Sequence, residues 1–145
     1  MISMKTTISD LFFLNRLPSW KELKVEAIRL KLDCNGVFTK LTDKEIEENF
    51  NYIGPDRLPE IIRLALSYLH KTVLPAVLIH DLDFYIGGSE DEFHRANRRL
   101  KDNMFICLKA NRRDFSFIGY HIERWHVRKA YALCEKYGYV GWHKK

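Results

Sequence analysis

The fold is decided by residues 75–110, which read PAVLIHDLDFYIGGSEDEFHRANRRLKDNMFICLKA. Pro75 suits the first turn of a helix, where its missing amide hydrogen is not needed. The apolar run that follows predicts a helix over residues 76–86. The pair Gly87-Gly88 ends this helix, because glycine readily adopts the left-handed conformation that follows a helical C-terminus.

A second, longer helix follows the glycine pair. Ser89 and Glu92 have the spacing of a capping box, which predicts a helix from Glu90 to about Ala110. Five apolar residues at helical spacing form its expected buried face: Phe93, Ala96, Leu100, Met104 and Cys107. Because the connection is short, we expect the two helices to run antiparallel, side by side.

The segment that precedes these helices has two interpretations. Residues 23–27 alternate apolar and polar side chains, as in a half-buried strand, and Asn35-Gly36 is a strong hairpin-turn signal. Residues 37–41 would then be the return strand. The competing interpretation is a helix over residues 21–31. Its apolar face would comprise Leu23, Ala27 and Leu30.

Further helices are expected at about residues 43–50, 59–69 and 117–137. Thr42 and Glu45 form a capping box before the first, Pro59 suits the start of the second, and Gly138 ends the last. Residues 51–56 read as a loop. The apolar stripe of the second helix would comprise Ile61, Ile62, Ala65, Leu66 and Leu69.

The predicted fold class is therefore α+β and mainly α, with an N-terminal β-hairpin followed by antiparallel helices. A chain of 145 residues suits a single domain. Residues 1–50 would hold the hairpin and the first helix, and residues 51–145 the helical core.

Charge is distributed unevenly along the chain. Residues 94–145 carry 13 Lys and Arg against 4 Asp and Glu, a net charge of +9, whereas residues 1–93 carry 11 against 15, a net charge of −4. This asymmetry indicates an anionic partner for the C-terminal part: an anionic phospholipid surface, nucleic acid or an acidic protein. A solvated helix face is the alternative.

The sequence argues against a membrane-spanning protein and against a secreted one. Its apolar runs are shorter than the roughly 18 residues of a spanning helix, and we expect no signal peptide. Three cysteines, Cys34, Cys107 and Cys134, form no disulfide framework and favour a reducing compartment, so we expect a protein that is not secreted.

Two adjacent ionisable residues, His80 and Asp81, interrupt the apolar helix and need partners if they are buried. Asn97 lies on the predicted inner face of the next helix, and its amide also needs a partner. We therefore predict that the side chains of His80 and Asn97 lie within hydrogen-bond reach. Asp81 projects about 100° around the helix from His80, and we predict that it points toward residues 52–56. A purely structural histidine and aspartate are the alternative.

These residues resemble a known family. The stretch Tyr52-Ile53-Gly54-Pro55, the dipeptide His80-Asp81 and the stretch GGSEDEFHRAN at residues 87–97 occur in the order seen in phospholipase A2-like proteins of the small phage and bacterial type. That pattern joins a calcium loop, a His-Asp helix and a glycine turn before the next helix. The resemblance covers about residues 51–104.

The resemblance implies a mechanism and a site. His80 would be the general base, oriented by Asn97, and would activate water to attack the sn-2 ester of a phospholipid. Calcium, held by Asp81 and by the backbone carbonyls of Tyr52 and Gly54, would stabilise the oxyanion. The resemblance also implies a location in the cytoplasm of a host cell or in a virion.

The chain departs from that family pattern at three places. Asn97 stands where the family has Asp, Phe84 stands where it has Tyr, and the loop after Gly54 lacks a further glycine. Two alternatives therefore accompany the hydrolase: the same fold without chemistry, as a structural or interaction protein such as a virion component, and a basic helical module that binds nucleic acid. His94, His121 and His126 have no ligand spacing, so we expect no dedicated transition-metal site.

Overall fold

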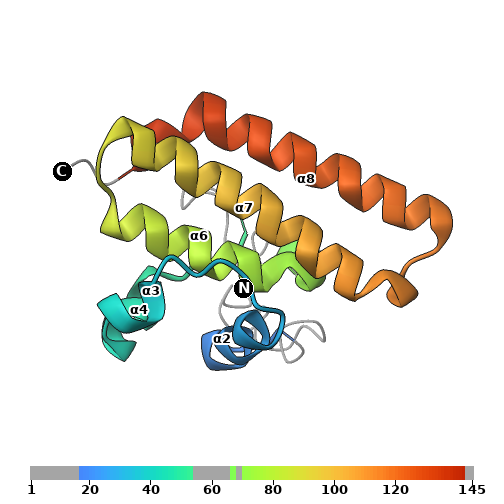
Figure 1. Ribbon diagram of the computed structural model, residues 1–145, viewed down its shortest axis with the longest axis horizontal. Helices are drawn as coiled ribbons and strands as arrows, with labels where there is room; N and C mark the ends of the chain where they lie inside the picture. Colours follow the sequence, from blue (N-terminus) through green and yellow to red (C-terminus); the bar gives the residue numbers. More distant parts are fainter. Residues whose placement is uncertain (1–16, 54–65, 68–69, 143–145) are drawn as a thin grey trace, which may run out of the picture.

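The computed structural model describes residues 17–53, 66–67 and 70–142 (Figure 1). Three long helices dominate it: α6, α7 and α8 lie in sequence order across the molecule, with α7 in contact with both others. The elements are α2 (Trp20–Arg29), α3 (Val37–Lys40), α4 (Asp43–Asn49), η2 (Lys71–Val73), α6 (Leu74–Ile86), α7 (Glu90–Ala110), η3 (Arg112–Asp114), α8 (Phe117–Tyr137) and η4 (Gly138–Gly141).

The predominantly helical prediction is confirmed. The helices expected after Ser89 and near Phe117 have the predicted bounds, and α6 begins two residues earlier than expected. Thr42 and Glu45 form the predicted reciprocal capping box, and Ser89 accepts the predicted bond from the backbone amide of Glu92. The helix expected from Pro59 falls almost entirely outside the described residues.

The predicted β-hairpin is wrong, because no strand forms in the described part of the chain and residues 20–29 are helical. Ser19 and Glu22 form a capping box that starts α2. Burial then follows helical spacing: Leu23 and Ala27 are 3% and 0% exposed, whereas Val25, which a strand would bury with them, is 66% exposed. The competing helical interpretation of this segment is therefore correct.

The turn signal within that segment is real, although the strands are not. Asn35 and Gly36 both have positive φ, 50° and 70°, and the amide of Val37 donates to the carbonyl of Cys34 at 3.0 Å. A type I′ turn has positive φ at both central residues and a hydrogen bond between its first and last residues, so the expected turn is present. The turn leads into α3 instead of a strand, so an Asn-Gly pair reports local conformation and not the elements that flank it.

The connection between α6 and α7 depends on glycine. Gly87 and Gly88 have φ of 71° and 137°, which side chains with a Cβ rarely adopt. A Cβ at Gly88 would also collide with the carboxylate of Glu92, which lies over the turn. The tight turn brings α6 and α7 together along their lengths (Figure 1).

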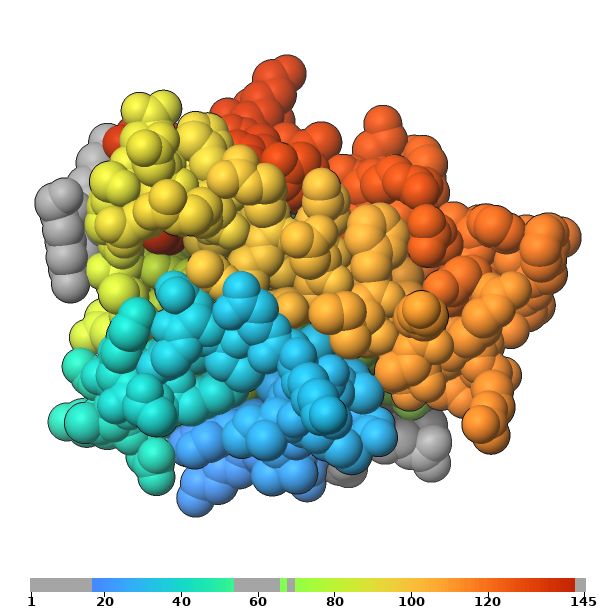
Figure 2. Space-filling model, in the orientation of Figure 1, coloured from blue at the N-terminus to red at the C-terminus, as the bar shows by residue number. Residues whose placement is uncertain are grey.

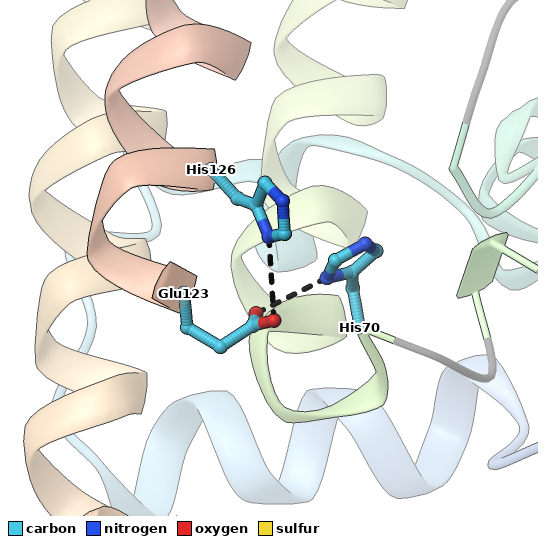
Figure 3. A group of neighbouring side chains, drawn as sticks. All are labelled: His70, Glu123 and His126. Carbon is cyan, nitrogen blue, oxygen red and sulfur yellow. Dashed lines mark hydrogen bonds and ion pairs between the residues drawn. The ribbon is translucent and has the colours of Figure 1, made fainter. Parts of the chain in front are cut away.

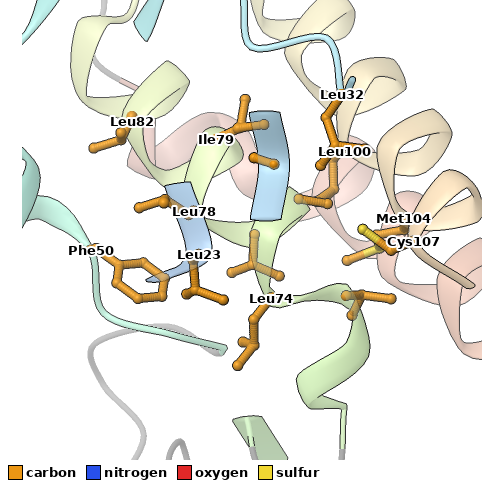
Figure 4. Close-up of a cluster of buried hydrophobic side chains, with 14 of the residues drawn as sticks. Leu23, Leu32, Phe50, Leu74, Leu78, Ile79, Leu82, Leu100, Met104 and Cys107 are labelled. Atoms are coloured by element: carbon orange, nitrogen blue, oxygen red, sulfur yellow. The ribbon is translucent and has the colours of Figure 1, made fainter. Parts of the chain in front are cut away.

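The main core lies where α2, α6 and α7 meet (Figure 4). α6 is buried on nearly every side, since α2, α3 and α4 cover one face and α7 covers the other. Figure 2 shows these N-terminal helices and α7 side by side on one face of the molecule. The residues labelled in Figure 4 are Leu23, Leu32, Phe50, Leu74, Leu78, Ile79, Leu82, Leu100, Met104 and Cys107.

Candidate functional site

The predicted contact between His80 and Asn97 is present. The Nε2 atom of His80, on α6, lies 2.9 Å from Oδ1 of Asn97, on α7, and the bond is buried. Both side chains project into the interface between the two helices, as their positions on the two inner faces predicted. In the described part of the chain Asn97 is the hydrogen-bond partner of the ring.

Aromatic side chains surround this pair. The ring of Phe84 lies 4.3 Å from the ring of His80, centroid to centroid, and Phe84 in turn contacts Phe93 and Trp142. The indole of Trp142 donates to the carbonyl of Gly88 at 2.9 Å, which fastens the segment after η4 to the α6–α7 turn. The histidine therefore sits at the edge of an aromatic cluster, in a setting of low polarity.

This environment sets the protonation of His80. With Oδ1 of Asn97 as acceptor, Nε2 carries the hydrogen, and Nδ1 keeps a free lone pair. Burial lowers the pKa of His80 below 6.5, while the Asn97 bond and the charge of Asp83 oppose this shift only in part. The ring is therefore neutral at pH 7, the form that accepts a proton. His80 is buried, with 9% of its surface exposed.

Asn97 fulfils only part of its hydrogen-bonding capacity. Its side chain is fully buried, and its Nδ2 has no partner within the described part of the chain. An unpaired buried donor costs about 1–3 kcal/mol. A carboxylate at this position would have no such donor and would stabilise a protonated His80. The amide therefore orients the ring but does not balance its charge.

Asp81 lies next to the segment that leads into the predicted calcium loop. Its Oδ2 accepts a bond from the backbone amide of Asn51 at 3.3 Å. The adjacent Tyr52 has a φ of 62°, and its hydroxyl donates to the carbonyl of Pro18. The structure thus places Asp81 beside Asn51, the residue before Tyr52, whereas Gly54 lies outside the described residues.

The sequence resemblance would place a tyrosine one turn after His80, where this chain has Phe84. Phe84 occupies the position one helical turn after His80 and contacts its ring. The following Tyr85 points elsewhere, because its hydroxyl donates to Glu45 of α4 at 3.3 Å. Tyr85 therefore does not replace the missing tyrosine beside His80.

A buried ion pair lies one turn from His80 on the same helix. Asp83 is 3% exposed and accepts bonds from Arg99 at 2.8 Å and from the side chain of Asn35 at 3.0 Å. Arg99 also reaches Asp33, whose backbone is held by Asn103 through both its amide and its carbonyl. This network locks the Asn35 turn onto α6 and α7.

A surface depression of about 340 Å³ lies between α2 and the start of α6. Its lining includes Glu22, Glu26, Lys71 and Asp114 but none of the predicted site residues. The depression is therefore separate from the His80–Asn97 pair.

Comparison with models of known protein families, with curated proteins and with solved structures yields no match. The case for function therefore depends on the chain's own geometry.

The structure also assembles a group that the sequence analysis missed. His70, Glu123 and His126 converge, with Glu123 between the two rings (Figure 3). Of these three residues only His126 is a histidine that the sequence prediction names, and its spacing from His94 and His121 does not indicate a metal site. The sequence does hold one indication of this group. Glu123 and His126 are three residues apart in a predicted helix and so share one of its faces.

The lowered pKa of His80 has a consequence for stability. The unfolded chain protonates His80 more readily than the folded chain does. The contribution of His80 to stability is therefore fully present above pH 6.5 and is lost as the pH falls toward the lowered pKa. We expect the free energy of unfolding of the wild type, measured by urea denaturation, to fall more steeply between about pH 7 and pH 5 than that of His80→Gln.

The comparison with His80→Gln is needed because His94 acts in the opposite direction. Glu135 raises the pKa of His94, so His94 contributes stability below pH 6.5 that is lost as the pH rises through the raised pKa. Parallel curves for wild type and His80→Gln would contradict a buried neutral His80.

Proposed function

We propose that the protein is a phospholipase A2-like hydrolase in which His80 is the general base. The observation that carries the proposal is the 2.9 Å bond between Nε2 of His80 and Oδ1 of Asn97, because it orients the ring and leaves Nδ1 as the proton acceptor. A histidine held in this way and kept neutral by burial is suited to activate water at pH 7.

The proposed reaction is hydrolysis of the sn-2 ester of a phospholipid. Nδ1 of His80 takes a proton from water while the water oxygen attacks the ester carbonyl carbon. The tetrahedral intermediate then collapses, the carbon–oxygen bond to the lysophospholipid breaks, and His80 returns the proton to the leaving oxygen. Asn97 keeps the ring in position throughout. The products are a fatty acid and a lysophospholipid.

Calcium fits the residues that the resemblance assigns to it. Asp81 contributes a carboxylate beside the backbone of Asn51, and hard cations prefer carboxylate and carbonyl oxygens. Asp81 and the carbonyls of Tyr52 and Gly54 would hold the ion. When bound, calcium would polarise the ester carbonyl and stabilise negative charge on its oxygen.

The exposed face of α8 supports a phospholipid surface as the partner. Large apolar side chains stay exposed along this helix: Phe117, Ile118, Ile122, Trp125, Leu133 and Tyr137. Lys129 lies over the Trp125 ring at 5.3 Å, so cations and aromatics are interleaved. Aromatic residues beside basic ones are typical of proteins that bind anionic membrane interfaces. In the described residues no helix is long and apolar enough to cross a membrane.

Calcium titration calorimetry on wild type and Asp81→Asn tests the proposed calcium site. We expect one weak site, with a dissociation constant of about 10⁻⁴–10⁻³ M, which is lost in Asp81→Asn because the substitution removes its only assigned carboxylate. Asp102→Asn, which removes an exposed carboxylate of α7, is the matched control and should bind calcium as the wild type does. Equal binding by Asp81→Asn would refute the assignment.

Asn97 favours a second candidate, the same fold without chemistry. A neutral amide with an unpaired buried Nδ2 orients His80 but does not stabilise its protonated form. In that case the protein would be a structural or interaction component, such as a virion protein, that retains the α8 surface. Hydrolysis assays separate the two candidates, since only the first predicts product.

A further inference from the structure

Two histidines and one glutamate from two distant segments of the chain meet at the surface of α8. Nδ1 of His70 lies 3.1 Å from Oε2 of Glu123, and Nδ1 of His126 lies 3.4 Å from Oε1 of the same carboxylate. The two imidazole rings are 5.0 Å apart, centroid to centroid. Figure 3 shows both rings directed at the carboxylate, with Glu123 and His126 on α8 and His70 just before η2.

The donor set and its spacing match those of a transition-metal ion. One ligand atom from each residue lies within 4.8 Å of the other two. Ions such as zinc bind imidazole nitrogen and carboxylate oxygen at about 2.0–2.2 Å, so small rotations of the side chains bring all three within range. The side chain of Glu123 is 15% exposed and that of His70 22%, which limits competition by water.

We propose that His70, Glu123 and His126 form a binding site for one zinc-class divalent ion. Both rings would bind through the atom that now faces Glu123, with their hydrogens on Nε2. Two histidines and a glutamate are also the protein ligands of several zinc enzymes, which leave a fourth position for water. His126 is the most exposed of the three side chains, at 41%, and so marks the solvent side of that position.

The ion would also connect parts of the fold that are distant in sequence. His70 precedes η2 and α6, whereas Glu123 and His126 lie more than 50 residues later on α8. α8 contacts α7 extensively, and several of its large apolar side chains are exposed. A bound ion would therefore fasten α8 to the N-terminal end of α6 and raise the melting temperature.

Zinc titration calorimetry tests the proposed site. We expect one zinc ion per chain for the wild type. Outer-shell substitutions at metal sites cost about 10–100-fold in affinity, so we expect loss of a direct ligand in Glu123→Gln or His126→Gln to cost about 100-fold or more. His121→Gln, which removes an exposed histidine of the same helix, is the matched control and should retain wild-type affinity.

Two readouts keep the test decisive. Circular dichroism establishes that each variant is folded, and His126→Gln, the variant of the most exposed ligand, takes the place of Glu123→Gln if the latter unfolds. The absorption spectrum with cobalt in place of zinc should show a four-coordinate ion without a thiolate band, which excludes binding at Cys134. Absence of zinc binding by the wild type, or unchanged affinity in both variants, would overturn the proposal.

The zinc site is independent of the phospholipase proposal. In the part of the chain that the structure describes, none of its three residues forms a hydrogen bond, ion pair or ring contact with His80, Asn97 or Asp81. We therefore expect His126→Gln to leave calcium binding as in the wild type, and Asp81→Asn to leave zinc binding unchanged. If the wild type binds calcium but not zinc, the zinc proposal fails. If it binds zinc but not calcium, the calcium site of the phospholipase proposal fails.

Discussion

His80→Gln is expected to lower sn-2 ester hydrolysis by about 10²–10⁴-fold, the usual contribution of a general base. Glutamine can still bond to Asn97 across the helix interface, so the fold should persist while the proton acceptor is lost. The measurement is fatty-acid release from phosphatidylglycerol vesicles in the presence of calcium, with circular dichroism to establish that the variant is folded.

Two further variants make this result specific. His94→Gln removes a more exposed histidine, paired with Glu135 at 2.6 Å, and should retain wild-type activity. Asn97→Asp should raise activity, because a carboxylate stabilises the imidazolium that forms and leaves no unpaired Nδ2. Equal rates for His80→Gln and wild type would show that His80 is a structural residue.

Arg99→Met is expected to lower the free energy of unfolding by about 3–5 kcal/mol, measured by urea denaturation. The cause is Asp83, which is 3% exposed and would lose its cationic partner at 2.8 Å while remaining buried. Within the described residues, the neutral side chain of Asn35 would be its remaining side-chain donor. A buried carboxylate without a counter-charge is among the most destabilising features of a folded chain.

The neighbouring residues offer controls for this effect. Asp33 also pairs with Arg99, but its side chain is 68% exposed, so Asp33→Asn should cost no more than about 1 kcal/mol. The double variant Asp83→Leu with Arg99→Met removes both charges and should recover much of the lost stability. An Arg99→Met cost as small as that of Asp33→Asn would mean that the buried pair contributes little.

Much of the helical pair could be predicted because its signals are local and agree with one another. The glycine pair, the Ser89 cap and the apolar face from Phe93 to Cys107 define where α7 begins and which side it buries. Together they placed Asn97 opposite His80, and the structure confirms that contact. The roles of these residues stay predictions.

The N-terminal segment shows where local pattern fails. Leu23, Val25 and Ala27 fit a strand, but Leu23 and Ala27 also fit a helix, and tertiary burial decides between them. The Ser19 cap was the overlooked signal. A capping box that precedes an ambiguous apolar pattern should have favoured helix.

The His70–Glu123–His126 group could not be predicted from spacing alone. Glu123 and His126 share a face of α8, but the third member comes from a segment 53 residues earlier. His70 reaches them because α8 and η2, which His70 precedes, both pack against α7. Such convergence is a property of the tertiary fold.

Hydrolysis by the His80–Asn97 pair is tested most directly by an assay of the wild-type chain on anionic phospholipid vesicles labelled at the sn-2 position. We expect release of the labelled fatty acid in calcium and no release after chelation of calcium. If calcium binds but no labelled product forms, the fold carries the His80–Asn97 pair without the chemistry, and the proposed activity is contradicted.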